Sequence, residues 1–217
     1  MQPSYLSLVQ MFGAPARYTV PLFQRPYVWN QEEQWEPLWD DIMHLADRVL
    51  AAEHGKPVAG HFLGTVVLEQ ELTATGTISC REIIDGQQRL TTLQILLKAA
   101  QHVLAEVEAR AQETKDEAAA KESGVAARQV GILTANFAFA EDEERYKVWP
   151  TNDDRAAFRQ VMDASDAGLV PLQTPRMAHA YHFFRGAIRT WIGNGRHIAV
   201  RASALAAACG VRHGWWQ

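Results

Sequence analysis

Residues 83–90, Ile-Ile-Asp-Gly-Gln-Gln-Arg-Leu, constrain the fold more than any other stretch of the chain. An apolar run typical of a buried strand ends at Asp85-Gly86, and a helical pattern of apolar residues begins at once. A strand that turns directly into a helix leaves backbone N–H groups free at the positive end of the helix dipole, which favours an anion such as phosphate. Gly86 lets a ligand approach the backbone, and Arg89 adds a permanent positive charge. The alternative interpretation is a tight turn with an ordinary helix cap.

Residues 18–29 form a second informative stretch, in which an extended apolar segment leads into Gln24 and Arg25. Glutamine and arginine are residue types that contact phosphate groups or the edges of nucleobases. Tyr27 and Trp29 follow, and their rings can either stack on a base or fill the hydrophobic core. The residue types alone leave both interpretations open.

The chain resembles the DUF262 family in the order of three motifs: Pro-x-x-Gln-Arg-Pro-Tyr-Val-Trp at 21–29, Phe-Leu-Gly at 62–64, and Ile-Asp-Gly-Gln-Gln-Arg-Leu-Thr-Thr-Leu at 84–93. Members of this family are N-terminal domains of modification-dependent restriction proteins of the GmrSD type and of phosphorothioate-sensing defence proteins. Residues 146–158 are similar to the Asn-Asp element of the family. The resemblance therefore extends from about Leu8 to about Ile192.

This resemblance implies an α+β fold, with a small mixed β-sheet similar to that of ParB and sulfiredoxin and a C-terminal helical extension. In a single domain over residues 1–217, the nucleotide-binding core would cover about 1–105 and the extension about 106–217. We expect Gly124 to interrupt the helix of the extension, and Ala202–Ala208 shows no family pattern. The apolar periodicity predicts strands near 17–20, 62–69 and 78–84 and helices near 5–12, 30–52, from 87, from 151 and over 177–191.

The two polar motifs together predict a nucleotide site. Backbone N–H groups around Gly86 would hold a phosphate, and Arg89 would neutralise charge on the terminal phosphates. Arg25 would complete the clamp from the other stretch, and Gln24 would contact a phosphate or a base.

Three further residues of the turn have expected roles in phosphoryl transfer. Asp85 would coordinate Mg²⁺ or, alternatively, cap the helix. Gln87 or Gln88 would orient the attacking water, as a glutamine does in some GTPases. The expected cofactor is Mg²⁺, and the expected substrate is a nucleoside triphosphate, with GTP favoured by the resemblance. Asp153 and Asp154, in the Asn-Asp element, could close the nucleotide site from the helical part, but we expect them mainly to serve as an acidic helix start.

The charge distribution bears on DNA binding. The net charge of −4 argues against an indiscriminate nucleic-acid binder, but no Asp or Glu follows Ala167. Arg185 and Arg189 lie in this basic third, which could face modified DNA while Tyr27 and Trp29 read the modification. The alternative is that the basic helix balances an acidic neighbour.

Several classes of protein are excluded by missing signals. There is no Gly-x-x-x-x-Gly-Lys-Ser/Thr motif, so a P-loop NTPase is not expected. Cys80 and Cys209 form neither a disulfide framework nor a metal motif. No stretch is long enough to span a bilayer and no basic-then-apolar leader is present, so the cytoplasm is the expected compartment.

The combined expectation is an NTPase module of a bacterial anti-phage system. Hydrolysis would couple the sensing of modified DNA to a nuclease in another domain or a partner protein, and a homo-oligomer is possible. No nuclease motif was found in this chain. The alternative is a DNA-binding sensor that does not hydrolyse nucleotide, and a third option is a nuclease that uses the ParB-like core as its active site.

Overall fold

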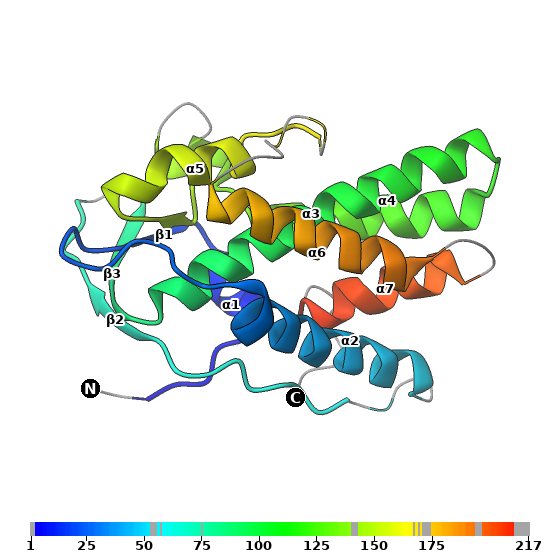
Figure 1. Ribbon diagram of the computed structural model, residues 1–217, viewed down its shortest axis with the longest axis horizontal. Helices are drawn as coiled ribbons and strands as arrows, with labels where there is room; N and C mark the ends of the chain where they lie inside the picture. The colour runs from blue at the N-terminus through cyan, green and yellow to red at the C-terminus, as the bar shows by residue number, and fades with distance from the viewer. Residues whose placement is uncertain are drawn as a thin grey trace.

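The computed structural model describes residues 3–52, 56, 58–74, 76–139, 143–166, 168, 170, 175–193 and 197–210. A small sheet lies at one end of the molecule, and long helices extend from it (Figure 1). The α+β class predicted from the sequence is confirmed. In chain order the elements are α1 (Leu8–Phe12), β1 (Ala16–Thr19), the π-helix η1 (Gln31–Trp35), α2 (Glu36–Ala51), β2 (Val67–Gln70), β3 (Ser79–Asp85), α3 (Gln87–Glu113), α4 (Glu117–Ile132), the 3-10 helices η2 (Phe137–Phe139) and η3 (Glu143–Arg145), β4 (Val148–Trp149), α5 (Asn152–Met162), α6 (Arg176–Ile192) and α7 (Ile198–Ala208).

The sheet has the strand order β2-β3-β1-β4, in which β1 is parallel to both β3 and β4 while β2 is antiparallel to β3. In the central strand, Tyr18 pairs with Arg81 of β3 on one side and with Val148 of β4 on the other. Three neighbouring strands therefore run in one direction, and their carboxyl ends meet at one edge of the sheet. Ligands of open sheets with parallel strands bind outside this edge.

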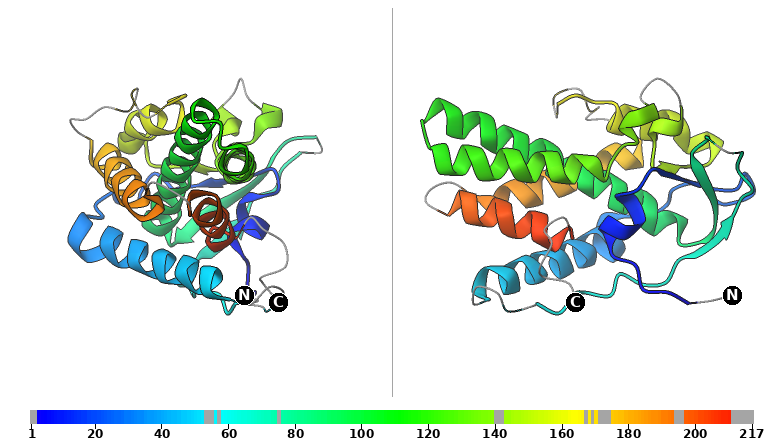
Figure 2. Two further views of the ribbon diagram at one scale, coloured as in Figure 1. Left: turned by 90° about the vertical axis from the view of Figure 1, so that its right-hand side faces the viewer. Right: turned by 180° about the vertical axis from the view of Figure 1, so that it is seen from behind.

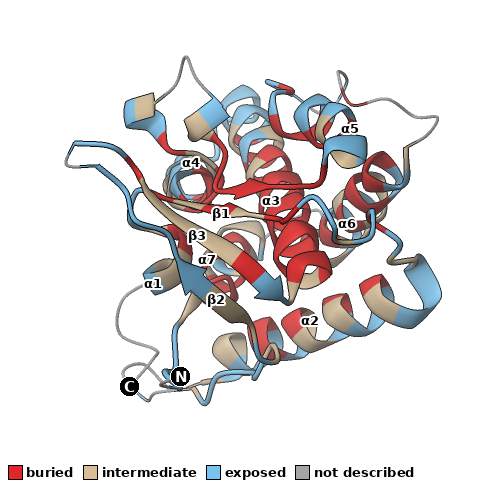
Figure 3. Cartoon of the chain, turned by 90° about the vertical axis from the view of Figure 1, so that its left-hand side faces the viewer, coloured by how far each residue is buried: buried red, intermediate tan, exposed pale blue. Residues whose placement is uncertain are grey.

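Helix α3 passes through the centre of the molecule and is buried along most of its length (Figure 3). Its apolar residues point to all sides, which is typical of a helix enclosed by other elements. Helices α4 and α6 pack against it, and one hydrophobic core includes residues of both the sheet and the helices. The expected division near residue 105 thus falls inside a continuous helix.

The region after α3 differs from the sequence-based expectation. The chain turns back after Glu113 and runs along α3 as α4. Gly124 does not interrupt a helix but lies buried inside α4. A β-carbon at this position would collide with the carboxylate of Glu108 on α3. The glycine therefore leaves space for the end of the Glu108 side chain between α4 and α3, a use that the sequence pattern did not reveal.

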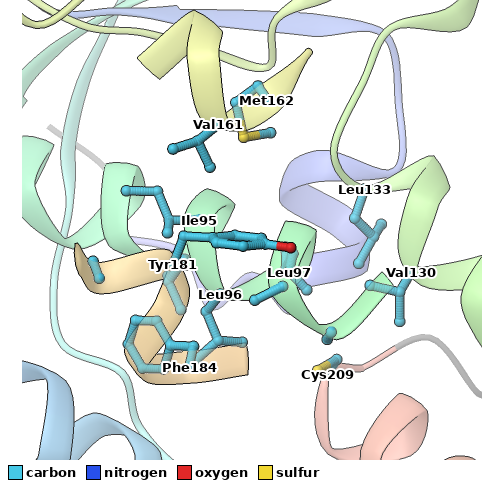
Figure 4. Close-up of a cluster of buried hydrophobic side chains, with 14 of the residues drawn as sticks. Ile95, Leu96, Leu97, Val130, Leu133, Val161, Met162, Tyr181, Phe184 and Cys209 are labelled. Atoms are coloured by element: carbon cyan, nitrogen blue, oxygen red, sulfur yellow. The ribbon is translucent and has the colours of Figure 1, made fainter. Parts of the chain in front are cut away.

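The alanine-rich segment Ala202–Ala208 forms most of α7, which packs between α4 and α2 (Figure 2). Alanine is the best helix former and its small side chain leaves room for neighbouring helices. Beside α7, larger side chains fill the core around Tyr181 and Phe184 of α6, both fully buried (Figure 4). Residues 211–217 lie outside the described part of the chain.

Some helix and strand boundaries differ from those expected from the sequence, at places where side chains bind the backbone. The first helix begins at Leu8, because Ser7 forms a capping box with Gln10. Of the strand expected at 62–69, only the part from Val67 onward pairs with β3. Just before it, the carbonyl of Thr65 accepts a hydrogen bond from Arg89 instead of from a strand. In the part of the chain that the structure describes, no helix is long and apolar enough to cross a membrane.

Candidate functional site

The three parallel strands bring three polar motifs to the same edge of the sheet. Strand β1 ends in the loop that contains Gln24 and Arg25, and β3 ends at the turn that starts α3. Strand β4 ends next to residues 150–154, which begin α5. These motifs are separated by about 60 residues in each case, and the strand order alone makes them neighbours. This edge is the candidate functional site.

The turn between β3 and α3 has the geometry of an anion-binding helix start. Gly86 is the N-cap residue and adopts a φ of 97°, a left-handed conformation that favours glycine. No side chain of the described residues caps this end, so its first N–H groups have no capping side-chain oxygen. Asp85 is exposed, and its carboxylate contacts no hydrogen-bond donor among the described residues. The alternative expectation that Asp85 caps the helix is therefore not seen.

Gln87 and Gln88 are buried, and both bind the loop that carries Arg25. The Gln87 amide donates to the carbonyl of Arg25 at 2.9 Å. The Gln88 amide donates to the carbonyl of Pro26 at 3.0 Å and accepts from the backbone N–H of Val28 at 2.9 Å. Gln88 thus uses both ends of its amide on the backbone. Gln87 Oε1 is buried and has no hydrogen-bond partner in the described part of the protein.

The two arginines of the predicted clamp differ in whether their guanidinium groups bind other residues. Arg89 donates to the carbonyl of Thr65, and Gly64 provides the space beside it, since a β-carbon on Gly64 would lie 2.8 Å from the guanidinium carbon. Arg25 is exposed, and its guanidinium has no partner among the residues that the structure describes. Gln24 donates to the carbonyl of Ile84 at 3.1 Å, which holds the loop beside the turn.

The aromatic residues after Arg25 belong to the core in this structure. Tyr27 is 7% exposed, and its hydroxyl lies 2.7 Å from the Thr92 hydroxyl and accepts a hydrogen bond from the Trp35 indole at 2.9 Å. Burial raises the pKa of Tyr27 to about 12. Trp29 is half-buried and packs against the same core. Neither ring is presented as an open stacking surface, and a role of Tyr27 and Trp29 in sensing modified DNA stays a prediction.

The Asn-Asp element closes the loop from the helical side. Asp154 accepts hydrogen bonds from the backbone N–H of Tyr27 at 2.8 Å and from the Thr151 hydroxyl at 2.9 Å. Burial raises the pKa of the Asp154 carboxyl. Asp154 is therefore more than an acidic helix start, because it also fixes the loop that carries Arg25. The sequence interpretation assigned no separate role to Gly64, and for Asp154 it favoured the helix start over the closing contact.

An open cleft of about 610 Å³ lies at the same edge. Its volume is within the range of roughly 300–1,000 Å³ typical of small-molecule sites. The Asp85–Arg89 turn does not line it, although Glu82 on the preceding strand does. The side chains that line the cleft are Thr19, Val20, Pro21, Leu22, Phe23, Glu71, Glu82, Asn152 and Arg155.

The basic face of α6 lies elsewhere and is paired with an acidic residue. Arg185 contacts Glu106 of α3 at 2.8 Å, and Arg189 contacts the other oxygen of that carboxylate at 3.8 Å. This arrangement agrees with the alternative interpretation of the basic C-terminal third, in which a basic helix balances an acidic neighbour. A role for Arg185 and Arg189 in binding DNA stays a prediction.

Comparison with known families agrees with these features. The model of the N-terminal domain of GmrSD restriction endonucleases matches residues 8–190. The matched range contains all three motifs at the carboxyl edge of the sheet, as well as α3 and nearly all of α6. No curated protein shows a significant match to the chain. The chain therefore belongs to the family of GmrSD restriction endonuclease N-terminal domains, a module of restriction defence systems.

Proposed function

We propose that this domain binds and hydrolyses a nucleoside triphosphate, with GTP preferred, and thereby couples the sensing of modified DNA to a nuclease in another domain or a partner protein. The observation that supports this most is the convergence of the Arg25 loop, the Asp85–Arg89 turn and the Asp154 element at the carboxyl edge of three parallel strands. Membership of a restriction endonuclease family gives the context.

In this proposal the start of α3 binds the phosphates. The uncapped N–H groups after Gly86 supply donors and the positive end of the helix dipole. Arg25, which is exposed, and Arg89, which has further guanidinium nitrogens beyond the one that binds Thr65, neutralise the charge of the phosphates. The cleft beside Phe23 offers room for the rest of the nucleotide.

Asp85 fits the role of a magnesium ligand. Among the described residues no three His, Cys, Asp or Glu side chains are grouped closely enough to form a metal cage. Mg²⁺ does not need one, since it is usually held by one or two carboxylates together with phosphate oxygens and water. The exposed, unpaired Asp85 carboxylate next to the phosphate-binding turn meets this requirement, and the ion would neutralise charge that develops during phosphoryl transfer.

Gln87 and Gln88 have different roles in this proposal. Gln88 has both ends of its amide bound to backbone and acts by positioning the Arg25 loop. Gln87 has a buried acceptor oxygen without a donor, and it is the better candidate for orienting the attacking water once substrate binding brings a water to that atom. Catalysis of phosphoryl transfer depends mainly on such placement and on charge neutralisation.

Phosphate release by the purified chain tests the proposal. The assay contains Mg²⁺ and each of GTP, ATP, CTP and UTP, with and without modified DNA. Arg89→Ala should slow turnover about 10- to 100-fold, because one charged interaction with the phosphates contributes about 1.5–3 kcal/mol. Arg48→Ala is the matched control, since Arg48 is an exposed arginine on α2.

The assay also separates the alternatives. Turnover that survives both Arg89→Ala and Arg25→Ala would overturn the site assignment. No turnover with any nucleotide, together with a DNA gel shift that is insensitive to nucleotide, would instead identify a sensor that does not hydrolyse. Metal-dependent nicking of DNA by this chain alone would identify a nuclease.

A further inference from the structure

A second, smaller pocket lies in the helical body, separate from the edge of the sheet. Its volume is about 260 Å³, which is below the range typical of drug-sized ligands. This volume is large enough to hold several water molecules. It lies between α3, the segment that follows α4 and the end of α5. Its polar lining consists of Lys98, Gln101, Thr134, Asn136, Arg145, Tyr146 and Asp163.

Lys98 is the unusual group of this pocket. It is 9% exposed, and its ammonium has no hydrogen bond or ion pair with any described residue. Burial lowers its pKa, because an ammonium is poorly solvated there. Buried lysines are rare unless they are paired, since an isolated charge away from water is costly. Lys98 therefore lines the pocket as a cation that has no acidic or hydrogen-bonding partner among the described residues.

The nearest acid is already engaged by other groups. Asp163 accepts hydrogen bonds from the Tyr146 hydroxyl at 2.7 Å and forms an ion pair with Arg145 at 2.6 Å. Both of its oxygens are thus used at the side of the pocket. With Lys98 and Arg145 positive and Asp163 negative, the lining carries one excess positive charge when Lys98 is protonated.

A second polar side chain of the lining is that of Asn136. Asn136 is 3% exposed, and its amide nitrogen donates to the carbonyls of Ala16 at 3.0 Å and Glu144 at 2.8 Å. Its Oδ1 is buried and has no partner within the described part of the chain. Because Asn136 Oδ1 is enclosed by protein, the unpaired group that the pocket offers to a ligand is the Lys98 ammonium.

We propose that this pocket binds a small oxyanion of the phosphate class, with Lys98 as its main cationic contact. Hydrogen phosphate has the required negative charge and several oxygens that can accept hydrogen bonds from the ammonium. The pocket is too small for a whole nucleotide, so the ligand is a free phosphate rather than the phosphate group of a nucleotide. The site is distinct from the Asp85–Arg89 turn and does not depend on it.

The wild-type protein provides the first test. The chain has five lysines, so ¹³C-dimethylation of their amines, which preserves the charge, gives a simple NMR spectrum. Addition of inorganic phosphate should shift the Lys98 resonance and raise the pKa of Lys98 toward its usual range, because an anion favours the charged form. No phosphate-dependent change, or an equal change with chloride at the same ionic strength, would refute the proposal.

Variants provide the second test, by calorimetric titration of inorganic phosphate. Lys98→Met should weaken binding about tenfold or more, whereas Lys121→Met, at an exposed position of α4, should not. Arg89→Ala should leave this binding intact, and loss of binding in Arg89→Ala would mean that the titrated phosphate occupies the α3 start instead. GMP should bind more weakly at Lys98 than phosphate does, and an equal Lys98 shift with GMP would show a nucleotide site.

Discussion

The two ends of α3 are held by different forces, and the amino-terminal half is the more deeply buried. At the amino-terminal end, Gln87, Gln88 and Thr92 bind residues 25–28 through hydrogen bonds of 2.7–3.0 Å. Toward the carboxyl end, residues such as Ala100 and Leu104 are enclosed by apolar side chains of the helical body. Hydrogen bonds fix direction as well as distance, whereas apolar packing depends mainly on volume.

This difference matches what each region has to do. A site for phosphate chemistry needs its donors in fixed positions, and the amides of α3 hold the Arg25 loop in place. The helical body needs only to be well filled, and the small alanine side chains of α7 let its helices lie close together. Four changes, from the largest expected effect to the smallest, test this contrast.

Phe184→Ala should destabilise the body most strongly. The side chain is fully buried, and removal of such a ring typically costs about 3–5 kcal/mol. Urea unfolding measures the loss. Phe23→Ala is the matched control, because Phe23 is 81% exposed beside the cleft and its loss should change the free energy of unfolding little. Similar effects of the two changes would contradict the packing described here.

Gln88→Ala should loosen the amino-terminal end of α3. The change leaves the Val28 N–H and the Pro26 carbonyl without their partner, at a cost of about 1–3 kcal/mol. Amide hydrogen exchange should rise specifically in residues 24–29. The control Gln112→Ala removes an exposed glutamine of the same helix. Unchanged exchange in the loop would show that the glutamine does not hold it.

His102 forms hydrogen bonds inside the helical body, and its contribution to the free energy of unfolding depends on pH. Its ring nitrogens lie 2.7 Å from the Tyr181 hydroxyl and 3.1 Å from the Ala164 carbonyl. Burial, aided by the charge of Lys98, lowers the pKa of His102 to about 4. The unfolded chain, with a histidine pKa of about 6.5, therefore binds a proton between pH 6.5 and 4 that the folded chain does not.

The free energy of unfolding should consequently fall as the pH drops from 6.5 toward 4. The contribution of His102 is at most about 1.4 kcal/mol per pH unit. His102→Gln removes this titration but keeps a donor and an acceptor, so its stability should depend less on pH in this window. Urea unfolding at pH 7, 6 and 5 measures both proteins, and parallel curves would contradict the expectation.

Arg185→Ala should have the smallest effect. Its ion pair with Glu106 is partly exposed to solvent, and such pairs contribute roughly 0–1 kcal/mol. DNA affinity should also stay the same, because the guanidinium is already paired. A double-mutant cycle with Glu106→Ala isolates the pair. A clear loss of DNA binding in Arg185→Ala would instead restore α6 as a DNA-binding surface.

The sequence by itself predicted features that depend on local signals. The junction at Asp85-Gly86 was predictable, because an apolar run, a glycine and a new helical period stand next to each other. The α+β class and the start of α5 near residue 151 followed from similar patterns. The order of the motifs also led to the correct family over residues 8–190.

Only the tertiary structure decided the partners of these residues. It placed Tyr27 in the core and Arg185 beside Glu106, and it bound Gln88 to a backbone segment about 60 residues earlier in the chain. Such contacts depend on strand order and helix packing, which bring together residues far apart in sequence. Local patterns determine which element a residue joins, whereas the burial and pairing of a polar side chain depend on what the completed fold places opposite it.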